Sequence, residues 1–287
     1  MNTNEGTIRQ RLVSCEWLTQ RLDDPQVRVL EVSSNPDGAA YHQAHIPGAA
    51  FWFWKEALWH ATDREFATPQ DMSRRLGAMG ISPETTVVIY GDPIQYGTYA
   101  IWVLVMAGHR DVRLLDGGRK RWVAEGRPMT AEIPRFDASD YTPEPADLSS
   151  RVGRDDVRAK LGTPERVLLD VRSPEEYQGE RVSPPTSGFD HGAERTGRIP
   201  GAVHLHYQEL LNEDDTFISA EQLRAKLAGA GVTEESGQEI VAYCRLSHRA
   251  TLAWFAMNYL LGMGDVKIYD GSWTEWGSIV GFPVEKD

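Results

Sequence analysis

Cysteine is scarce in this chain of 287 residues, which contains only Cys15 and Cys244. Two cysteines cannot form the disulfide framework of a small secreted domain. Nothing in their segments brings the two together, so a reduced pair is favoured over a single bridge. No group of cysteines and histidines has the spacing of a zinc site. We therefore expect neither a metal nor another cofactor.

Long apolar runs and an excess of basic residues are also missing. No stretch approaches the roughly 20 apolar residues of a membrane span, and Met1 to Gln20 lacks the apolar core of a signal peptide. The chain has 30 Lys and Arg against 42 Asp and Glu, a formal net charge of -12. A protein that follows nucleic-acid phosphates needs a basic face instead. We expect a cytoplasmic protein that binds neither membranes nor nucleic acid.

The two halves of the chain are copies of one domain. Three pairs of segments match: 13–25 with 152–164, 29–32 with 168–171, and 45–49 with 198–202. The offset grows from 139 to 153 residues between the second and third pairs, so the second copy carries additional residues within 181–197. That stretch is rich in Pro, Gly and Ser and is predicted to be a surface loop. The predicted domains are residues 8–129 and 151–287, joined by a linker over 130–150.

Each copy alternates short apolar segments with helical patterns. In the first copy, strands are predicted over 27–32, 87–90 and 112–115, and helices over 14–22, 68–79 and 98–107. In the second copy, Ser219 and Gln222 have the spacing of a capping box. The alternation predicts α/β domains, each a mainly parallel sheet with helices on both faces. Sites in such domains lie beyond the carboxyl ends of the strands.

The stretch from Ile240 to Leu261 carries the chemistry. Its apolar start predicts a buried strand, and apolar residues recur at helical spacing from Ala250 onward. Cys244 then lies at a strand-to-helix turn, where converging backbone N–H groups and the positive end of a helix favour an anion and a thiolate. We predict that Cys244 is a nucleophile. The predicted substrate-binding residues are Arg245, Leu246, Ser247, His248 and Arg249.

Both cysteines also have a purely structural interpretation. A lone Cys at the end of a strand is often an inert core residue. This interpretation is disfavoured for Cys244, because the ionisable side chains that follow it are costly to bury unpaired. It is preferred for Cys15, which is expected to be a partly buried helix residue without a catalytic role.

Three motifs are recognisable in the sequence. They are Tyr41–Ala49, which ends in His45-Ile46-Pro47-Gly48-Ala49; Asp170–Tyr177, which opens the second copy; and Val266–Trp276, which contains Asp270-Gly271-Ser272-Trp273. With these motifs the chain resembles the rhodanese family of sulfurtransferases. The resemblance is to the tandem-domain type that uses thiosulfate or 3-mercaptopyruvate, and it covers residues 14–283.

The resemblance implies two tandem rhodanese-like domains and a persulfide cycle. Cys244 takes a sulfane sulfur from a small anionic donor and delivers it to cyanide or a thiol, and the resemblance also allows a protein acceptor. The first domain is implied to be inactive, because Gly91 stands where Cys244 stands in the second. The residues expected to support the site are Asp170, Arg172 and Trp273.

The chain departs from the family pattern in two places. Several tandem members bind the donor anion with an arginine where this chain has Glu176. The loop from Cys244 to Arg249 matches neither the usual thiosulfate form nor the usual mercaptopyruvate form and is closer to bacterial variants with a second arginine. Arg249 is expected to bind the donor and to supply much of the preference for thiosulfate. The less favoured alternative is that it pairs with a carboxylate such as Glu176 and only braces the loop.

Thiosulfate is the expected donor, because cationic groups favour a dianion and the sulfite that leaves. A 3-mercaptopyruvate sulfurtransferase is the alternative. A Cys-dependent phosphatase is disfavoured, because its loop places five residues between Cys and Arg, whereas four separate Cys244 from Arg249. A non-enzymatic sulfur-binding or regulatory module is disfavoured because one copy retains the nucleophile and the other lacks it.

Overall fold

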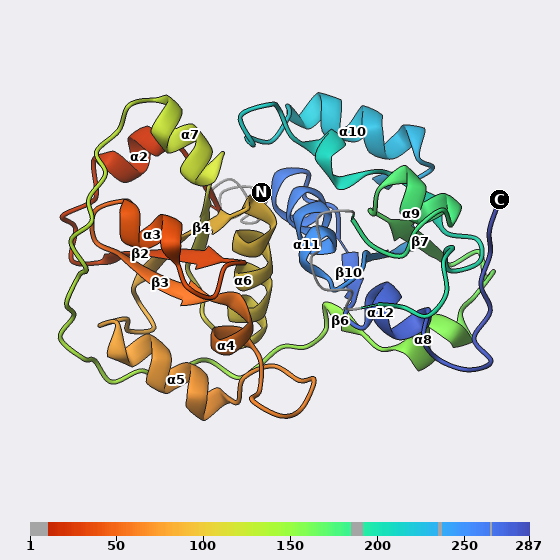
Figure 1. Ribbon diagram of the computed structural model, residues 1–287, viewed down its shortest axis with the longest axis horizontal. Helices are drawn as coiled ribbons and strands as arrows, with labels where there is room; N and C mark the ends of the chain where they lie inside the picture. Colours follow the sequence, from red (N-terminus) through yellow and green to blue (C-terminus); the bar gives the residue numbers. More distant parts are fainter. Residues whose placement is uncertain (1–10, 185–191, 235–236, 265) are drawn as a thin grey trace. The chain divides into compact units, whose positions relative to one another are not determined.

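The computed structural model describes residues 11–184, 192–234, 237–264 and 266–287. The chain forms two compact units that divide between Leu148 and Ser149, except that Glu213–Thr216 belongs with the first unit. Over the described residues each unit contains one five-stranded sheet whose neighbouring strands all run parallel (Figure 1). The predicted fold class, two tandem α/β domains built on mainly parallel sheets, is confirmed.

The first unit has the strand order β1-β5-β4-β2-β3. Its strands are β1 (Leu12–Val13), β2 (Val27–Ser33), β3 (Ala49–Phe53), β4 (Thr86–Asp92) and β5 (Val112–Leu115). Its helices are α2 (Cys15–Thr19), α3 (Ala39–Gln43), α4 (Trp54–Leu58), α5 (Pro69–Ala78), α6 (Ile94–Met106) and α7 (Gly118–Ala124).

The second unit repeats this topology with the strand order β6-β10-β9-β7-β8. Its strands are β6 (Arg151–Val152), β7 (Arg166–Asp170), β8 (Val203–His204), β9 (Glu239–Tyr243) and β10 (Val266–Tyr269). Its helical segments are α8 (Arg154–Ala159), α9 (Pro174–Gln178), η1 (Tyr207–Leu210), α10 (Ala220–Gly229), α11 (His248–Phe255), the π-helical turn η3 (Ala256–Leu260) and α12 (Ser272–Trp276).

Helix caps set several of these boundaries. The Thr68 hydroxyl accepts the N–H of Asp71 at the start of α5. Ser219 and Gln222 form both hydrogen bonds of the predicted capping box, at 3.0 and 3.2 Å. Helix α6 begins four residues earlier than predicted, at Ile94, directly after a proline and without a side-chain cap that a pattern search could recognise.

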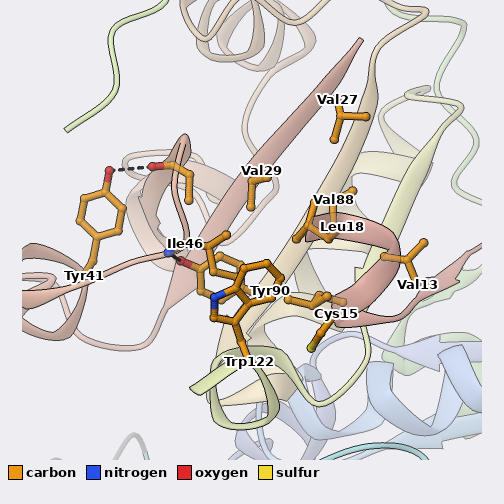
Figure 2. Packing of buried hydrophobic residues seen from close by; sticks show 12 residues of the cluster. Val13, Cys15, Leu18, Val27, Val29, Tyr41, Ile46, Val88, Tyr90 and Trp122 are labelled. Atoms are coloured by element: carbon orange, nitrogen blue, oxygen red, sulfur yellow. Dashed lines mark hydrogen bonds between the residues drawn. The ribbon is translucent and has the colours of Figure 1, made fainter. Parts of the chain in front are cut away.

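Apolar residues cover the sheet of the first unit. Figure 2 shows the cluster on one face, where α2, α3 and α7 contribute Leu18, Tyr41 and Trp122 against alternate residues of β2 and β4. Cys15 is one of the buried members of this cluster, which matches its expected structural role. Helix α6 packs against β2, β4 and β5. This cover is typical of parallel sheets, whose strands have apolar residues on both faces.

The duplication is visible in the hydrogen bonds. In the first copy, the N–H of Ile46 donates to the hydroxyl of Tyr90 at 3.4 Å (Figure 2), and in the second the N–H of Ile199 donates to the hydroxyl of Tyr243 at 3.2 Å. The two tyrosines lie at the ends of equivalent strands, so each copy ties its Ile-Pro-Gly-Ala turn to the strand beside it.

The segment predicted as a linker packs on the first unit. Thr130 pairs with His45 as an isolated antiparallel bridge, and the N–H of Ser139 donates to the carbonyl of Gly77 at 2.9 Å. Tyr141 contacts His109 through a 2.9 Å hydrogen bond. The first unit therefore extends to Leu148, beyond residue 129 where the sequence placed its end. Residues 185–191, the middle of the predicted surface loop, lie outside the described residues.

Gly91 has no space for a side chain. A Cβ atom built there meets the carbonyl oxygens of Ile94 and Pro93 at 2.6 Å and also collides with the backbone nitrogen of Gly97. These are backbone atoms of Pro93 and of the first turn of α6, so they cannot rotate away. The first copy is therefore built around a glycine at this position, and a cysteine does not fit there without a shift of the turn.

We predict that Gly91→Cys lowers the Tm by about 5 °C, because forcing atoms into a packed site costs about 1–3 kcal/mol. Thermal unfolding of the variant measures this change. Gly229→Ala is the control, because a Cβ at Gly229 meets nothing within 4 Å. A Gly91→Cys protein as stable as wild type would contradict the close packing of this turn.

Candidate active site

Cys244 directly follows β9, which is the central strand of the second sheet. The residue is 1% exposed and begins the turn that leads into α11. This is the strand-to-helix position that the sequence predicted. In a parallel sheet the carboxyl end of a central strand is the usual place for a site, because the neighbouring crossover connections diverge there.

Hydrogen bonds from the start of α12 hold the turn. The N–H of Cys244 donates to the Ser272 hydroxyl at 3.2 Å, and the N–H of Trp273 donates to the Cys244 carbonyl at 2.9 Å. The Ser247 hydroxyl donates to the carbonyl and carboxylate of Asp270, at 2.5 and 3.0 Å. Ser247 and Ser272 have φ values of 71° and 52°, which L-residues with a side chain adopt at a cost. The surrounding contacts therefore fix a strained turn.

Backbone N–H groups after Cys244 remain open. Within the described part of the chain, no acceptor is found for the N–H groups of Arg245, Leu246, Ser247 and Arg249. The last two belong to the start of α11, where the first N–H groups of a helix have no intrahelical partner. Such N–H groups, with the positive end of the helix dipole, form a cradle for an anion.

Arg249 and Glu176 form a buried ion pair. The two terminal nitrogens of Arg249 donate to the two carboxylate oxygens of Glu176, at 2.7 and 2.9 Å. Glu176 is fully buried and Arg249 is 9% exposed. Burial alone raises the pKa of Glu176, but the hydrogen bonds and charge of Arg249 outweigh it and lower the pKa to about 2. The sequence favoured donor binding for Arg249, whereas its observed pair with Glu176 has the geometry of the alternative role, the brace.

A second ion pair lies beside the turn. Arg172 donates from Nη2 to Asp170 Oδ2 at 2.5 Å and to the Gly197 carbonyl at 2.8 Å, and both charged residues are fully buried. The guanidinium carbon is 4.6 Å from the centre of the Trp273 ring, a cation–π contact. Asp170, Arg172 and Trp273 thus form one packed group, and the Trp273 N–H joins it to Cys244.

The remaining predicted residues differ in their surroundings. Arg245 and Leu246 are half-buried, and His248 is buried at the first position of α11. The Arg245 Nη1 atom is buried without a hydrogen-bond partner, and no ion pair of Arg245 is found among the described residues. Arg245 is therefore a cation that a bound anion can engage.

Sequence reasoning missed several residues of this group. Ser272 and Asp270 hold the turn, and Tyr207 lies with its ring centre 5.9 Å from the guanidinium carbon of Arg249. Burial, followed by the charge of Arg249, lowers the pKa of the neighbouring His206. One sequence signal was present for Ser272, since Asp270-Gly271-Ser272 matches Asp116-Gly117-Gly118 of the first copy. Gly118 has a φ of 51°, so both copies adopt a left-handed backbone at this position.

The described helices include none that is both long enough and apolar enough to span a bilayer. In the same residues, no group of three or more His, Cys, Asp and Glu side chains is arranged to hold a metal ion.

Comparison with known proteins identifies the family. The model of the rhodanese-like domain matches residues 14–125 and 153–279, one match in each copy. The chain belongs to the rhodanese family. The sulfur carrier protein TtuD of Thermus thermophilus is 44% identical over 96% of both chains. A Haloferax volcanii protein named "Putative thiosulfate sulfurtransferase" is 41% identical over 99% of both chains. These names support a rhodanese-type sulfurtransferase.

Two solved structures show the same architecture. The wild-type structure of EanB aligns with a TM-score of 0.83 and 27% identity, covering 97% of this chain and 70% of that chain. The crystal structure of YnjE aligns with a TM-score of 0.82 and 25% identity, covering 96% and 68% of the two chains.

We predict a pH dependence of stability from the Glu176 pKa. Because this pKa is lowered from 4.5 to about 2, the carboxylate contributes stability fully above pH 4.5 and loses it as the pH falls toward 2. The Tm difference between wild type and Glu176→Gln is expected to shrink over that range. Exposed Glu180→Gln is the control and should show no such trend. A constant difference from pH 7 to pH 2 would contradict the pairing.

Proposed function

We propose that this rhodanese transfers a sulfane sulfur from thiosulfate to cyanide or a thiol through a persulfide on Cys244. The observation that carries the proposal is the turn after β9, where a buried cysteine is followed by open backbone N–H groups and the cation Arg245. The first copy has Gly91 at the equivalent strand end and no space for a side chain.

The transfer takes two steps. In the first, the Cys244 thiolate attacks the outer sulfur of thiosulfate, the bond between the two sulfurs of the donor breaks, and sulfite leaves with the electron pair. The product is the persulfide anion of Cys244. In the second step, cyanide attacks the outer sulfur of the persulfide, forms thiocyanate and returns the Cys244 thiolate. Nucleophilic catalysis divides one difficult transfer into two easier ones.

The residues of the turn take different parts in this cycle. The open N–H groups of Arg245, Leu246, Ser247 and Arg249 stabilise the donor anion and then the persulfide. Arg245 binds the donor and the departing sulfite through its unengaged guanidinium nitrogen. Leu246, Ser247 and His248 form the remainder of the loop, and Ser247 fixes its backbone through Asp270.

The group formed by Asp170, Arg172 and Trp273 is proposed to hold the turn in position. Its two charges neutralise each other, and Trp273 bonds the Cys244 carbonyl. These residues act by position and do not touch the donor. We further propose that residues 151–287 form the catalytic domain and that the first domain is inactive.

A 3-mercaptopyruvate sulfurtransferase is the second candidate. The ion pair between Arg249 and Glu176 favours this second candidate in one respect. Because Glu176 neutralises Arg249, the loop has fewer unpaired cations than its sequence indicates, which suits a monoanionic donor. A sulfur-relay role with a protein acceptor is compatible with either donor, and the name of the Thermus thermophilus relative, a sulfur carrier protein, supports it. Phosphatase activity and a purely non-enzymatic role remain disfavoured on the loop length and on Cys244 itself.

We predict that incubation with thiosulfate adds about 32 Da, one sulfur atom, at Cys244 alone, and that cyanide removes it. Intact-protein and peptide mass spectrometry measure the addition. Cys244→Ser should neither acquire the label nor transfer sulfur to cyanide, because a serine hydroxyl is far less acidic than a thiol.

Cys15→Ser is the matched control and should retain labelling and activity. Burial, with a contribution from Glu125, raises the Cys15 pKa to about 11, so few of these thiols are thiolate at neutral pH. Sulfur found at Cys15, or substantial transfer by Cys244→Ser, would contradict the mechanism. Hydrolysis of an aryl phosphate in place of sulfur transfer would favour the phosphatase.

A further inference from the structure

The ion pair between Glu176 and Arg249 determines how much positive charge the site offers. Both terminal nitrogens of Arg249 are taken by the carboxylate, and Glu176 also accepts the N–H of Ser173 at 3.2 Å. The bond from the Ser173 N–H belongs to the capping box at the start of α9, so the helix fixes the Glu176 carboxylate in place. Arg249 is thus held on a rigid partner.

The net positive charge around the turn is therefore smaller than the arginines of the loop sequence indicate. Glu176 cancels the charge of Arg249, and Asp170 cancels that of Arg172. Arg245 is the arginine of this group for which no ion pair is found within the described residues. A donor therefore meets roughly one net positive charge from these five residues, in addition to the backbone N–H groups.

We infer that Glu176 is a specificity-determining residue, which limits the preference of the site for dianionic thiosulfate over monoanionic 3-mercaptopyruvate by neutralising Arg249. The inference rests on the proposed function, since it concerns the donor of the same cysteine. Glu176 does not contact the reacting sulfur atoms. It acts through Arg249, and the effect is on the choice of donor.

Electrostatics gives the direction and size of the effect. Removing the Glu176 charge adds one net positive charge beside Cys244, and a dianion gains about twice as much from it as a monoanion. With an effective dielectric near that of partly buried sites, the ratio of kcat/KM values for thiosulfate and 3-mercaptopyruvate should rise by about tenfold. A brace without an electrostatic role would change both kcat/KM values by the same factor.

The test measures kcat/KM for both donors, with cyanide as acceptor, in wild type and Glu176→Gln. Glutamine keeps the size of the side chain and an oxygen for the capping bond. We expect the thiosulfate to mercaptopyruvate ratio to rise about tenfold, and the KM for thiosulfate to become more sensitive to salt. Glu180→Gln removes a charge from an exposed position nearby and should leave the ratio unchanged. An unchanged or lower ratio in a folded Glu176→Gln protein would overturn the inference.

A double variant tests the same inference if the unpaired Arg249 destabilises Glu176→Gln. Glu176→Gln with Arg249→Gln removes both charges, so its ratio should stay within about twofold of wild type, because the pair contributes no net charge. A ratio that shifts fivefold or more in either direction would overturn the inference. Failure of the proposed function is distinguishable, since it would appear as wild-type protein that transfers sulfur from neither donor.

Discussion

The site depends on a backbone constraint: the turn after β9 must keep its N–H groups unpaired. Side chains from the start of α12 meet this constraint by taking the other bonds of the turn. Ser272 accepts the N–H of Cys244, and Asp270 accepts the Ser247 hydroxyl. With the turn fixed in this way, the N–H groups of Arg245, Leu246, Ser247 and Arg249 are left without an acceptor among the described residues. We propose that they stabilise an anion or a persulfide without reorganisation of the protein, and that the charged side chains adjust the affinity for it.

The two copies show what can change while the fold stays the same. Both retain the hydrogen bond from an Ile-Pro-Gly-Ala turn to a strand-end tyrosine. Each also pairs the carboxylate of its second strand with an arginine, but the arginine comes from a different place. In the first copy Arg119, at the position of Trp273, donates to Glu31 at 2.5 Å, whereas in the second Arg172 pairs with Asp170. The buried charge is neutralised in both copies, while the strand end carries Cys244 in the second copy and Gly91 in the first.

Local sequence patterns predicted the duplication, the alternating elements and the position of Cys244. The duplication was recognised by matching segments of the two halves. Hydrophobic periodicity predicted the alternating elements and the position of Cys244, because each of these depends on residues close in the chain. The partners of the turn were harder to predict, since Ser272 lies 28 residues after Cys244 and Glu176 lies 73 residues before Arg249. Pairing with Glu176 was the less favoured of two roles considered for Arg249, because no sequence pattern decides between a donor anion and a carboxylate as its partner. The packing of residues 130–148 was missed because its partners, His45, Gly77 and His109, lie far from it in the sequence.

We propose that the transferred sulfur is held on Cys244 by the N–H groups of the turn. A high-resolution crystal structure of protein treated with thiosulfate tests this most directly. We expect one extra sulfur atom bonded to the Cys244 sulfur, within hydrogen-bonding distance of the N–H groups of the turn, with Arg249 still paired to Glu176. An unmodified Cys244, or an Arg249 that has left Glu176 to bind the persulfide or sulfite, would contradict the central claim.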